Sequence, residues 1–310
     1  MCDNDSFDDM VADSSRAEQF SRRGFGHLSL GAGLATLLPL GCKPADSAPV
    51  AGAATAAGHA GASATTESEV SIATSEGTCD AYFVHPAKGP APAVIVWPDI
   101  FGLRPAFRQM GKRLAESGYA VLVVNPFYRT KKAPTSEPHA NLEDPKTRET
   151  LMGLAKTLTQ DTAFTDAKAL TAWLDQQPQV DKSHKMGTTG YCMGGPIALR
   201  TAGANPERIG AAATFHGGGL VTDNPESPHL LIPKMKAQFL IAIASNDDAK
   251  EPNAKETLKA SFAQASLRAN VEVFEGALHG WCPPDSRVYK ADSAEKAWTE
   301  LLALLKSALG

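Results

Sequence analysis

Residues 190–195 read Gly-Tyr-Cys-Met-Gly-Gly, between an apolar strand-like run and a segment of helical composition. The stretch matches the G-x-S-x-G strand–turn–helix motif, with Cys192 in the position of the nucleophilic serine. Side chains two places from the nucleophile would collide with the strand and the helix, and Gly190 and Gly194 avoid this. The turn also places Cys192 at a helix N-terminus, where the helix dipole favours a thiolate. The alternative is a buried structural cysteine beside a glycine-rich turn.

On both sides of this motif the chain alternates between strand-like and helix-like segments. The expected strands are 70–73, 81–84, 93–97, 119–124, 186–191, 211–215, 239–244 and 271–274, and the expected helices are 105–117, 146–158, 165–176, 194–201, 253–265 and 294–309. This order predicts an α/β fold, with a mostly parallel sheet of about eight strands covered by helices on both faces. In such folds the active site lies at the carboxyl ends of the strands.

The loops after the last two expected strands carry an acid and a histidine. Asp247 and Asp248 follow the first of these strands, and His279 follows the second. This chain order, nucleophile then acid then histidine, is the one that accompanies the G-x-S-x-G motif. His279 would take the proton of Cys192, and a carboxylate would hold its imidazole in the required tautomer. We choose Asp247 because it is nearer the strand end, with Asp248 as the rival. The alternative role for either aspartate is a helix cap.

Four motifs together resemble the dienelactone hydrolase family, a branch of the α/β-hydrolase fold with a Cys-Asp-His triad. They are Trp-Pro-Asp-Ile-Phe-Gly at 97–102, the motif at 190–195, Asn-Asp-Asp at 246–248 and Leu-His-Gly at 278–280. The similarity covers residues 70–310. It implies a nucleophile, an acid and a base at Cys192, Asp247 and His279, and an oxyanion hole made by the backbone amides of Ile100 and Met193.

The resemblance also implies a hydrolase of carboxylic esters or lactones that works through a thioester on a small-molecule substrate. The sequence has no zinc-type His/Cys cluster and no phosphate-cradling G-x-x-x-x-G-K, so no metal or cofactor is expected. Two alternatives stay open: another acyl or carbon–halogen hydrolase on the same fold, and a non-catalytic exported binding protein. The sequence identifies neither the substrate nor the oligomeric state.

Two features depart from the family pattern. Asp99 stands where the family often has a glutamate that helps to activate the cysteine, and it is one methylene shorter; an N-cap is its other reading. Family members that act on anionic lactones hold the substrate carboxylate with arginines. Arg129 follows a strand at a suitable place, and Arg287 is the candidate for the second arginine, although it lies further from His279 than expected. Whether an anionic substrate is held stays open.

Further side chains near the strand ends are candidates for the pocket. An apolar wall is expected from aromatic residues, which are otherwise core: Phe101, Phe127, Tyr128 and Trp281. His216 follows a strand, where it would line the pocket or pack a loop. Cys79 and Cys282 would form a disulfide after export, or remain two unpaired thiols.

The first 69 residues differ from the rest of the chain. Residues 1–42 contain Arg22-Arg23 before a short, weakly apolar stretch, which resembles a twin-arginine export signal. Cys42 follows Leu-Gly as in a bacterial lipoprotein cleavage site, so a periplasmic protein is expected, with a membrane anchor if Cys42 is lipidated. Residues 43–69 are rich in Ala, Gly, Ser and Thr and are expected to form a flexible linker to the catalytic domain at 70–310.

The composition excludes several other classes of protein. Of 310 residues, 43% are hydrophobic and 21% are charged, and the net charge is −4. These fractions are those of a globular protein. The mildly acidic balance lacks the excess of basic residues that nucleic-acid binding requires. Five cysteines are too few for a disulfide scaffold.

Overall fold

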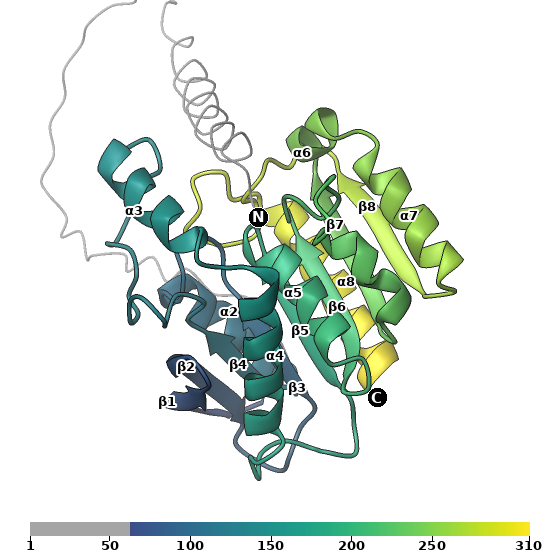
Figure 1. Ribbon diagram of the computed structural model, residues 1–310. Coiled ribbons are helices and arrows are strands. Elements are labelled where there is room, and N and C mark those ends of the chain that lie inside the picture. Colours follow the sequence, from purple (N-terminus) through teal and green to yellow (C-terminus); the bar gives the residue numbers. More distant parts are fainter. Residues whose placement is uncertain (1–62) are drawn as a thin grey trace, which may run out of the picture.

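The computed structural model describes residues 63–310. The twin-arginine motif, Cys42 and most of the expected linker lie outside the described residues, so the structure does not bear on them. The described chain forms an eight-stranded sheet in the order β1-β2-β4-β3-β5-β6-β7-β8 (Figure 1). The strands are β1 (Thr65–Thr74), β2 (Gly77–Pro86), β3 (Ala93–Trp97), β4 (Ala120–Val124), β5 (Met186–Tyr191), β6 (Ile209–Phe215), β7 (Gln238–Ala244) and β8 (Ala269–Phe274).

The sheet is antiparallel at one edge and parallel elsewhere. β1 pairs with β2 and β2 with β4 in the antiparallel sense, whereas every pairing from β4 through β3 to β8 is parallel. The parallel strands are near-continuous apolar runs; β3 and β4 are buried at every position, as expected of strands covered on both faces. The predicted α/β fold is confirmed.

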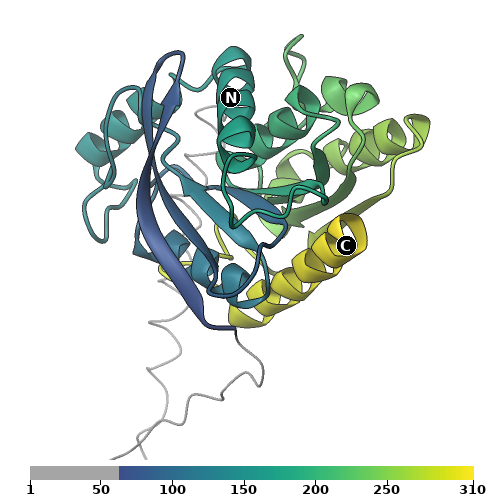
Figure 2. The same ribbon diagram turned by 90° about the horizontal axis from the view of Figure 1, so that it is seen from below.

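Helices cover both faces of the sheet (Figure 2). They are α2 (Pro105–Glu116), α3 (Pro145–Ala155), α4 (Gln160–Leu174), α5 (Gly194–Ala204), α6 (Ser245–Lys250), α7 (Ala254–Gln264) and α8 (Ala291–Leu309), with a 3₁₀ helix η1 (Pro228–Lys234). One core lies between the sheet and α2 with α8, and another lies between the opposite face and α4, α5 and α7. Adjacent residues of one strand, such as Tyr82 and Phe83, therefore belong to different cores.

The separation of the two cores favours two unpaired thiols over a disulfide between Cys79 and Cys282. Cys79 lies in the core under α4 and α5, whereas Cys282 lies in the core under α2 and α8. Both are free, buried thiols. Because the sheet stands between them, no rotamer brings the sulfurs within bonding distance.

Two elements begin five residues earlier than expected. Thr65–Glu69, which the sequence places in the linker, form the first half of β1, because the hairpin register extends from Thr65 opposite Pro86 to Thr74 opposite Gly77. Helix α4 begins at Gln160 rather than at 165, since Thr159 and Thr162 form a reciprocal capping box.

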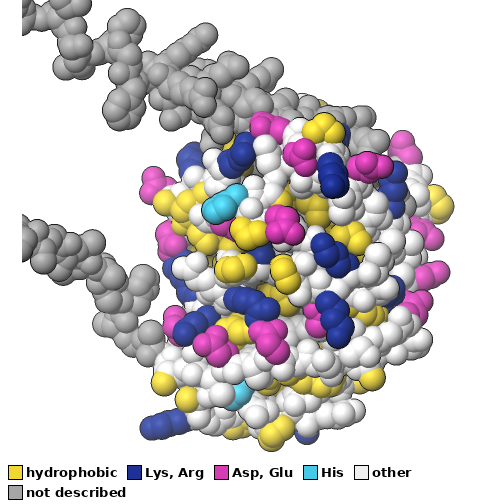
Figure 3. All heavy atoms as spheres, turned by 90° about the vertical axis from the view of Figure 1, so that its left-hand side faces the viewer, with side chains coloured by type: hydrophobic (Ala, Val, Ile, Leu, Met, Phe, Trp, Pro, Cys, Tyr) yellow, Lys and Arg dark blue, Asp and Glu magenta, His cyan; other side chains and the backbone are white. Residues whose placement is uncertain are grey.

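The surface on the side of β1 and β2 carries mixed charge. Figure 3 shows basic and acidic side chains interspersed over this face, without a large patch of one sign. No helix within residues 63–310 is long and apolar enough to cross a membrane.

Candidate active site

Cys192 lies on a tight turn between β5 and α5, in a backbone conformation rare for a side-chain-bearing residue. Its φ is 52°. A Cβ on Gly190 would lie 2.0 Å from the carbonyl oxygen of Gly194, and one on Gly194 would lie 2.2 Å from the carbonyl oxygen of Trp97. Both positions therefore exclude any side chain, which is the physical requirement of the nucleophile-elbow motif.

The turn fixes Cys192 at the N-terminus of α5. Its N–H donates to the carbonyl of Phe215 at 3.0 Å, and its carbonyl accepts from the N–H of Gly195 at 2.9 Å. These bonds tie the turn to β6 and to the first turn of α5. The partial positive charge of the helix N-terminus favours the thiolate over the thiol at this place.

His279 and Asp247 meet across the ends of β8 and β7. The distance from His279 Nδ1 to Asp247 Oδ2 is 2.7 Å, and the backbone N–H of His279 donates to Asn246 Oδ1 at 2.8 Å. Asp248, the rival acid, instead accepts from Lys255 Nζ at 2.6 Å. Asp247 is thus the carboxylate that orients the imidazole, leaving Nε2 as the nitrogen able to accept a proton.

An apolar cluster surrounds the cysteine. Its buried members are Ile100, Phe127, Leu142, Leu151, Met152, Leu154, Cys192 and Met193, and Phe101 packs against it. The cluster brings together the two residues expected to supply the oxyanion hole. Leu151, Met152 and Leu154 of the cluster belong to α3, so this helix packs beside Cys192. No sequence motif marks this contact, because only amphipathic spacing identifies α3 in the segment between β4 and α4.

The loop after β3, residues 98–104, is held against the nucleophile turn. The backbone of Trp97 and Pro98 approaches Gly194 so closely that a Cβ there would lie within 2.8 Å of it. Within this loop, Asp99 Oδ1 accepts from the N–H of Phe101 at 2.9 Å, and the Asp99 carbonyl accepts from the N–H of Gly102. Asp99 also forms a bidentate pair with Arg104, a partner that the sequence did not suggest.

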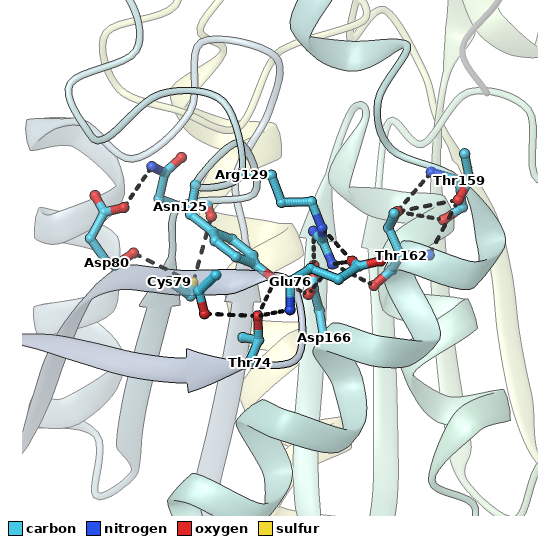
Figure 4. A network of polar contacts seen from close by, with 11 residues as sticks. Thr74, Glu76, Cys79, Asp80, Asn125, Arg129, Thr159, Thr162 and Asp166 are labelled. Atoms are coloured by element: carbon cyan, nitrogen blue, oxygen red, sulfur yellow. Dashed lines mark hydrogen bonds and ion pairs between the residues drawn. The ribbon is translucent and has the colours of Figure 1, made fainter.

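Arg129 lies in a polar network on one side of the molecule (Figure 4). Its Nη1 and Nη2 donate to the two carboxylate oxygens of Asp166 at 2.9 and 2.7 Å, and its Nε donates to Glu76 at 2.6 Å. Tyr128 donates its hydroxyl to Asp166 at 2.7 Å. These contacts join the β1–β2 turn to α4. The structure therefore favours a structural role for Arg129 and Tyr128 over the expected part in binding substrate.

Arg287 and Trp281 also have partners within the protein. Arg287 Nη1 donates to Glu143 Oε2 at 3.2 Å, which links the loop after His279 to the segment that leads into α3. Trp281 is fully buried and stacks on Phe274, so it belongs to the core and not to a pocket wall.

The ring of His216 packs against that of His279. Its ring centroid lies 5.2 Å from that of His279 and 5.0 Å from that of Trp281. Neither ring nitrogen has a hydrogen-bond partner in the structure. Burial, together with the nearby His279, holds the pKa of His216 well below its ordinary value of 6.5, so the ring is neutral. His216 supports His279 from behind instead of lining a pocket or packing a surface loop.

Within residues 63–310, no group of three or more His, Cys, Asp or Glu side chains is arranged to hold a metal ion. The site combines a cysteine at a helix N-terminus, an Asp–His pair at neighbouring strand ends, and a backbone loop close to the cysteine. This combination suits nucleophilic acyl chemistry.

Comparison with known proteins agrees with this geometry. A family profile described as "Dienelactone hydrolase family" matches residues 79–309. The chain belongs to the dienelactone hydrolase family. A member from Escherichia coli K12 named "Putative carboxymethylenebutenolidase" is 26% identical over 231 residues, covering 73% of this chain and 81% of the relative. The carboxymethylenebutenolidase of Pseudomonas putida is 25% identical over 212 residues, covering 68% and 84%.

The fold of this dienelactone hydrolase family member is shared with solved structures. One is a dienelactone hydrolase-like promiscuous phosphotriesterase from metagenomic libraries. It superposes with a TM-score of 0.66 at 23% identity, covering 80% of this chain and 100% of the other. At that identity the likeness establishes the α/β-hydrolase fold alone.

Proposed function

We propose that this protein hydrolyses carboxylic esters or lactones with Cys192 as nucleophile, His279 as base and Asp247 as the orienting acid. The observation that carries the proposal is the 2.7 Å hydrogen bond between His279 Nδ1 and Asp247. The positive φ of Cys192, which is typical of a nucleophile elbow, supports it. Family membership and the carboxymethylenebutenolidase relatives support the same reaction class.

The reaction has two stages. His279 Nε2 takes the proton from the Cys192 thiol, and the thiolate attacks the ester carbonyl carbon. The carbonyl oxygen, now negative, accepts hydrogen bonds from the backbone N–H groups of Ile100 and Met193, each worth roughly 3 kcal/mol in the transition state. The C–O bond breaks, and the alcohol or enol leaves with the proton from the imidazolium. His279 then activates water, which hydrolyses the thioester and regenerates the thiol, while Asp247 holds the ring throughout.

The environment of Cys192 favours an ester of apolar character. The side chains around the sulfur come from α3 and from the loops after β3 and β4, and most of them are aliphatic or aromatic. Arg129, Arg287 and Arg104 each pair with carboxylates of the protein. We therefore propose substrates that do not depend on a carboxylate clamp for binding.

The decisive experiment compares the wild type with Cys192→Ala on p-nitrophenyl acetate. Loss of turnover in the variant, with a thioester adduct at Cys192 detected by mass spectrometry in the wild type, supports the proposal. Equal turnover in both proteins overturns it. A panel of neutral and carboxylate-bearing esters and lactones then defines the substrate class.

We further propose that the protein is exported through the twin-arginine route to the periplasm. The support is the sequence of residues 1–42, with Arg22-Arg23 before a weakly apolar run and Cys42 at its end. Mass spectrometry of the mature N-terminus tests this: diacylglyceryl-modified Cys42 supports a membrane anchor. An unmodified start after Ala51 or Ala53 excludes lipidation but leaves export standing, and an intact N-terminus at Met1 counts against export.

A further inference from the structure

The side chain of Arg104, at the start of α2, lies between two carboxylates. Nη1 and Nη2 bind the two oxygens of Asp99 at 2.6 and 2.9 Å. Nε and Nη2 bind the two oxygens of Asp285 at 2.7 and 3.0 Å. Both pairs are bidentate, so the planar guanidinium fixes the direction as well as the distance of each carboxylate.

The guanidinium is held away from solvent by apolar neighbours. The side chain of Arg104 is 13% exposed, and its cationic carbon lies 5.5 Å from the ring centroid of Phe101 and 4.8 Å from that of Phe107. Burial alone would lower the pKa of Arg104, but the charges of Asp99 and Asp285 raise it above its ordinary value. The group therefore stays charged and acts through its geometry, not by exchanging protons.

The two carboxylates belong to the two loops that the proposed reaction must bring together. Asp99 precedes Ile100, whose N–H is the expected oxyanion donor, and Asp99 also shapes this loop by accepting from the N–H of Phe101. Asp285 lies on the segment after β8 that carries His279. These loops are far apart in the sequence and meet at Arg104.

We propose that Arg104 is a positioning residue for the reaction, which rests on the proposed function. It holds the loop after β3 against the loop after β8. The N–H of Ile100 and the imidazole of His279 are thereby both placed to act on the ester group of one bound substrate. Small errors in the placement of such groups cost large factors in rate, which gives the clamp its catalytic value.

A neighbouring ion pair on the same helix offers a matched control. Arg113 binds Glu295 with both terminal nitrogens at 2.7 and 2.5 Å, and its guanidinium lies over Trp298 at 4.3 Å. This pair also joins α2 to a distant segment, α8, but neither partner lies on a loop that carries a triad or oxyanion residue. Its loss should affect stability without affecting the chemistry.

The test measures kcat and KM on p-nitrophenyl acetate together with the rate at which iodoacetamide alkylates Cys192. Alkylation needs the thiolate but no oxyanion hole. We expect Arg104→Gln to lower kcat by about 10- to 100-fold, with KM and the alkylation rate changed less than about threefold. Arg104→Lys should recover part of the kcat that Arg104→Gln loses. Arg113→Gln should keep at least about half of the wild-type kcat, even if its melting temperature falls as much as that of Arg104→Gln.

The proposal is overturned if Arg104→Gln keeps kcat within twofold of the wild type, or if Arg113→Gln loses as much kcat at an equal loss of melting temperature. Should Arg104→Gln fail to fold, Asp285→Ala removes one arm of the clamp from a partly exposed carboxylate. It is expected to lower kcat about tenfold with Cys192 alkylation retained, and unchanged kcat overturns the proposal. If the wild type and Cys192→Ala turn over p-nitrophenyl acetate at the same rate, the proposed function and this inference both fail. If the wild type is active and Cys192→Ala is not, the Arg104 variants test the role of Arg104 alone.

Discussion

His279 Nδ1 lies 2.7 Å from Asp247 Oδ2, while the adjacent Asp248 turns to Lys255, whose Nζ lies 2.6 Å from it. Two consecutive aspartates in the first turn of α6 thus have different partners. Successive residues of a helix point about 100° apart, so only one of them faces the end of β8. Asp248 therefore serves as the control for substitutions of Asp247.

Asp247→Asn should lower kcat on p-nitrophenyl acetate by about 100-fold or more, because the amide no longer favours the tautomer that leaves Nε2 free to accept a proton. Asp248→Asn removes the ion pair with Lys255, which makes no contact with His279, and should change kcat less than about threefold. Steady-state kinetics of both variants check this. If Asp248→Asn lowered kcat more than Asp247→Asn, the assignment of Asp247 as the orienting acid would be wrong.

Gly190→Ala should destabilise the protein by about 3 kcal/mol or more and abolish turnover, because the new methyl would overlap the carbonyl of Gly194 at 2.0 Å. Gly153→Ala is the control, since a Cβ there meets nothing within 4 Å in α3. It should raise the free energy of unfolding by roughly 0.5 kcal/mol through helix propensity. Urea denaturation of both variants measures the difference, and a stable, active Gly190→Ala would contradict the geometry of the turn.

The stability of the protein should fall below pH 6.5 on account of His216. Its pKa in the folded protein is lowered, so the unfolded chain binds the proton more readily. The contribution of His216 is therefore fully present above the unfolded pKa of about 6.5 and is lost as the pH falls, by at most about 1.4 kcal/mol per pH unit. His216→Phe should show a shallower decline in the free energy of unfolding between pH 7 and pH 5. Parallel curves for the two proteins would show that His216 takes no part.

Cys79 and Cys282 should react slowly with iodoacetamide in the native protein, because burial raises the pKa of both thiols. Cys192 is buried as well, but it lies at the N-terminus of α5, where the helix dipole favours the thiolate, so it should be alkylated first. After unfolding without reductant, both buried cysteines should be labelled fully, since they are free thiols. Peptide mapping under non-reducing conditions measures the labelling, and a cross-linked peptide containing both residues would refute this.

Much of the site was accessible from local patterns. The Gly-Tyr-Cys-Met-Gly-Gly stretch marks the turn at Cys192, because the steric limits of a strand-to-helix turn are local to a few residues. The order of Cys192, Asp247 and His279 along the chain then followed from the alternation of strands and helices. Proximity to the strand end favoured Asp247 over Asp248, but the contacts of the two carboxylates depend on where β8 lies.

The partners of the arginines were not accessible in the same way. Arg129 was expected to face the substrate, yet its guanidinium is taken by Asp166 and Glu76, which lie on α4 and on the β1–β2 turn. No sequence motif marks Arg104, although it joins two loops of the site. An ion pair leaves no periodic trace in a sequence, because its partners are set by the packing of distant elements.

The sequence by itself determined the order of the elements and the strained turn at Cys192, because both follow from short-range sterics and hydrophobic periodicity. It also supplied the residues of the proposed triad, because each of them follows an expected strand. Tertiary structure alone decided which aspartate meets His279, which carboxylates hold Arg104 and Arg129, and that Cys79 and Cys282 remain apart. The physical reason is the sheet itself: it brings distant strand ends to one edge and separates residues on its two faces, and neither relation can be read along the chain.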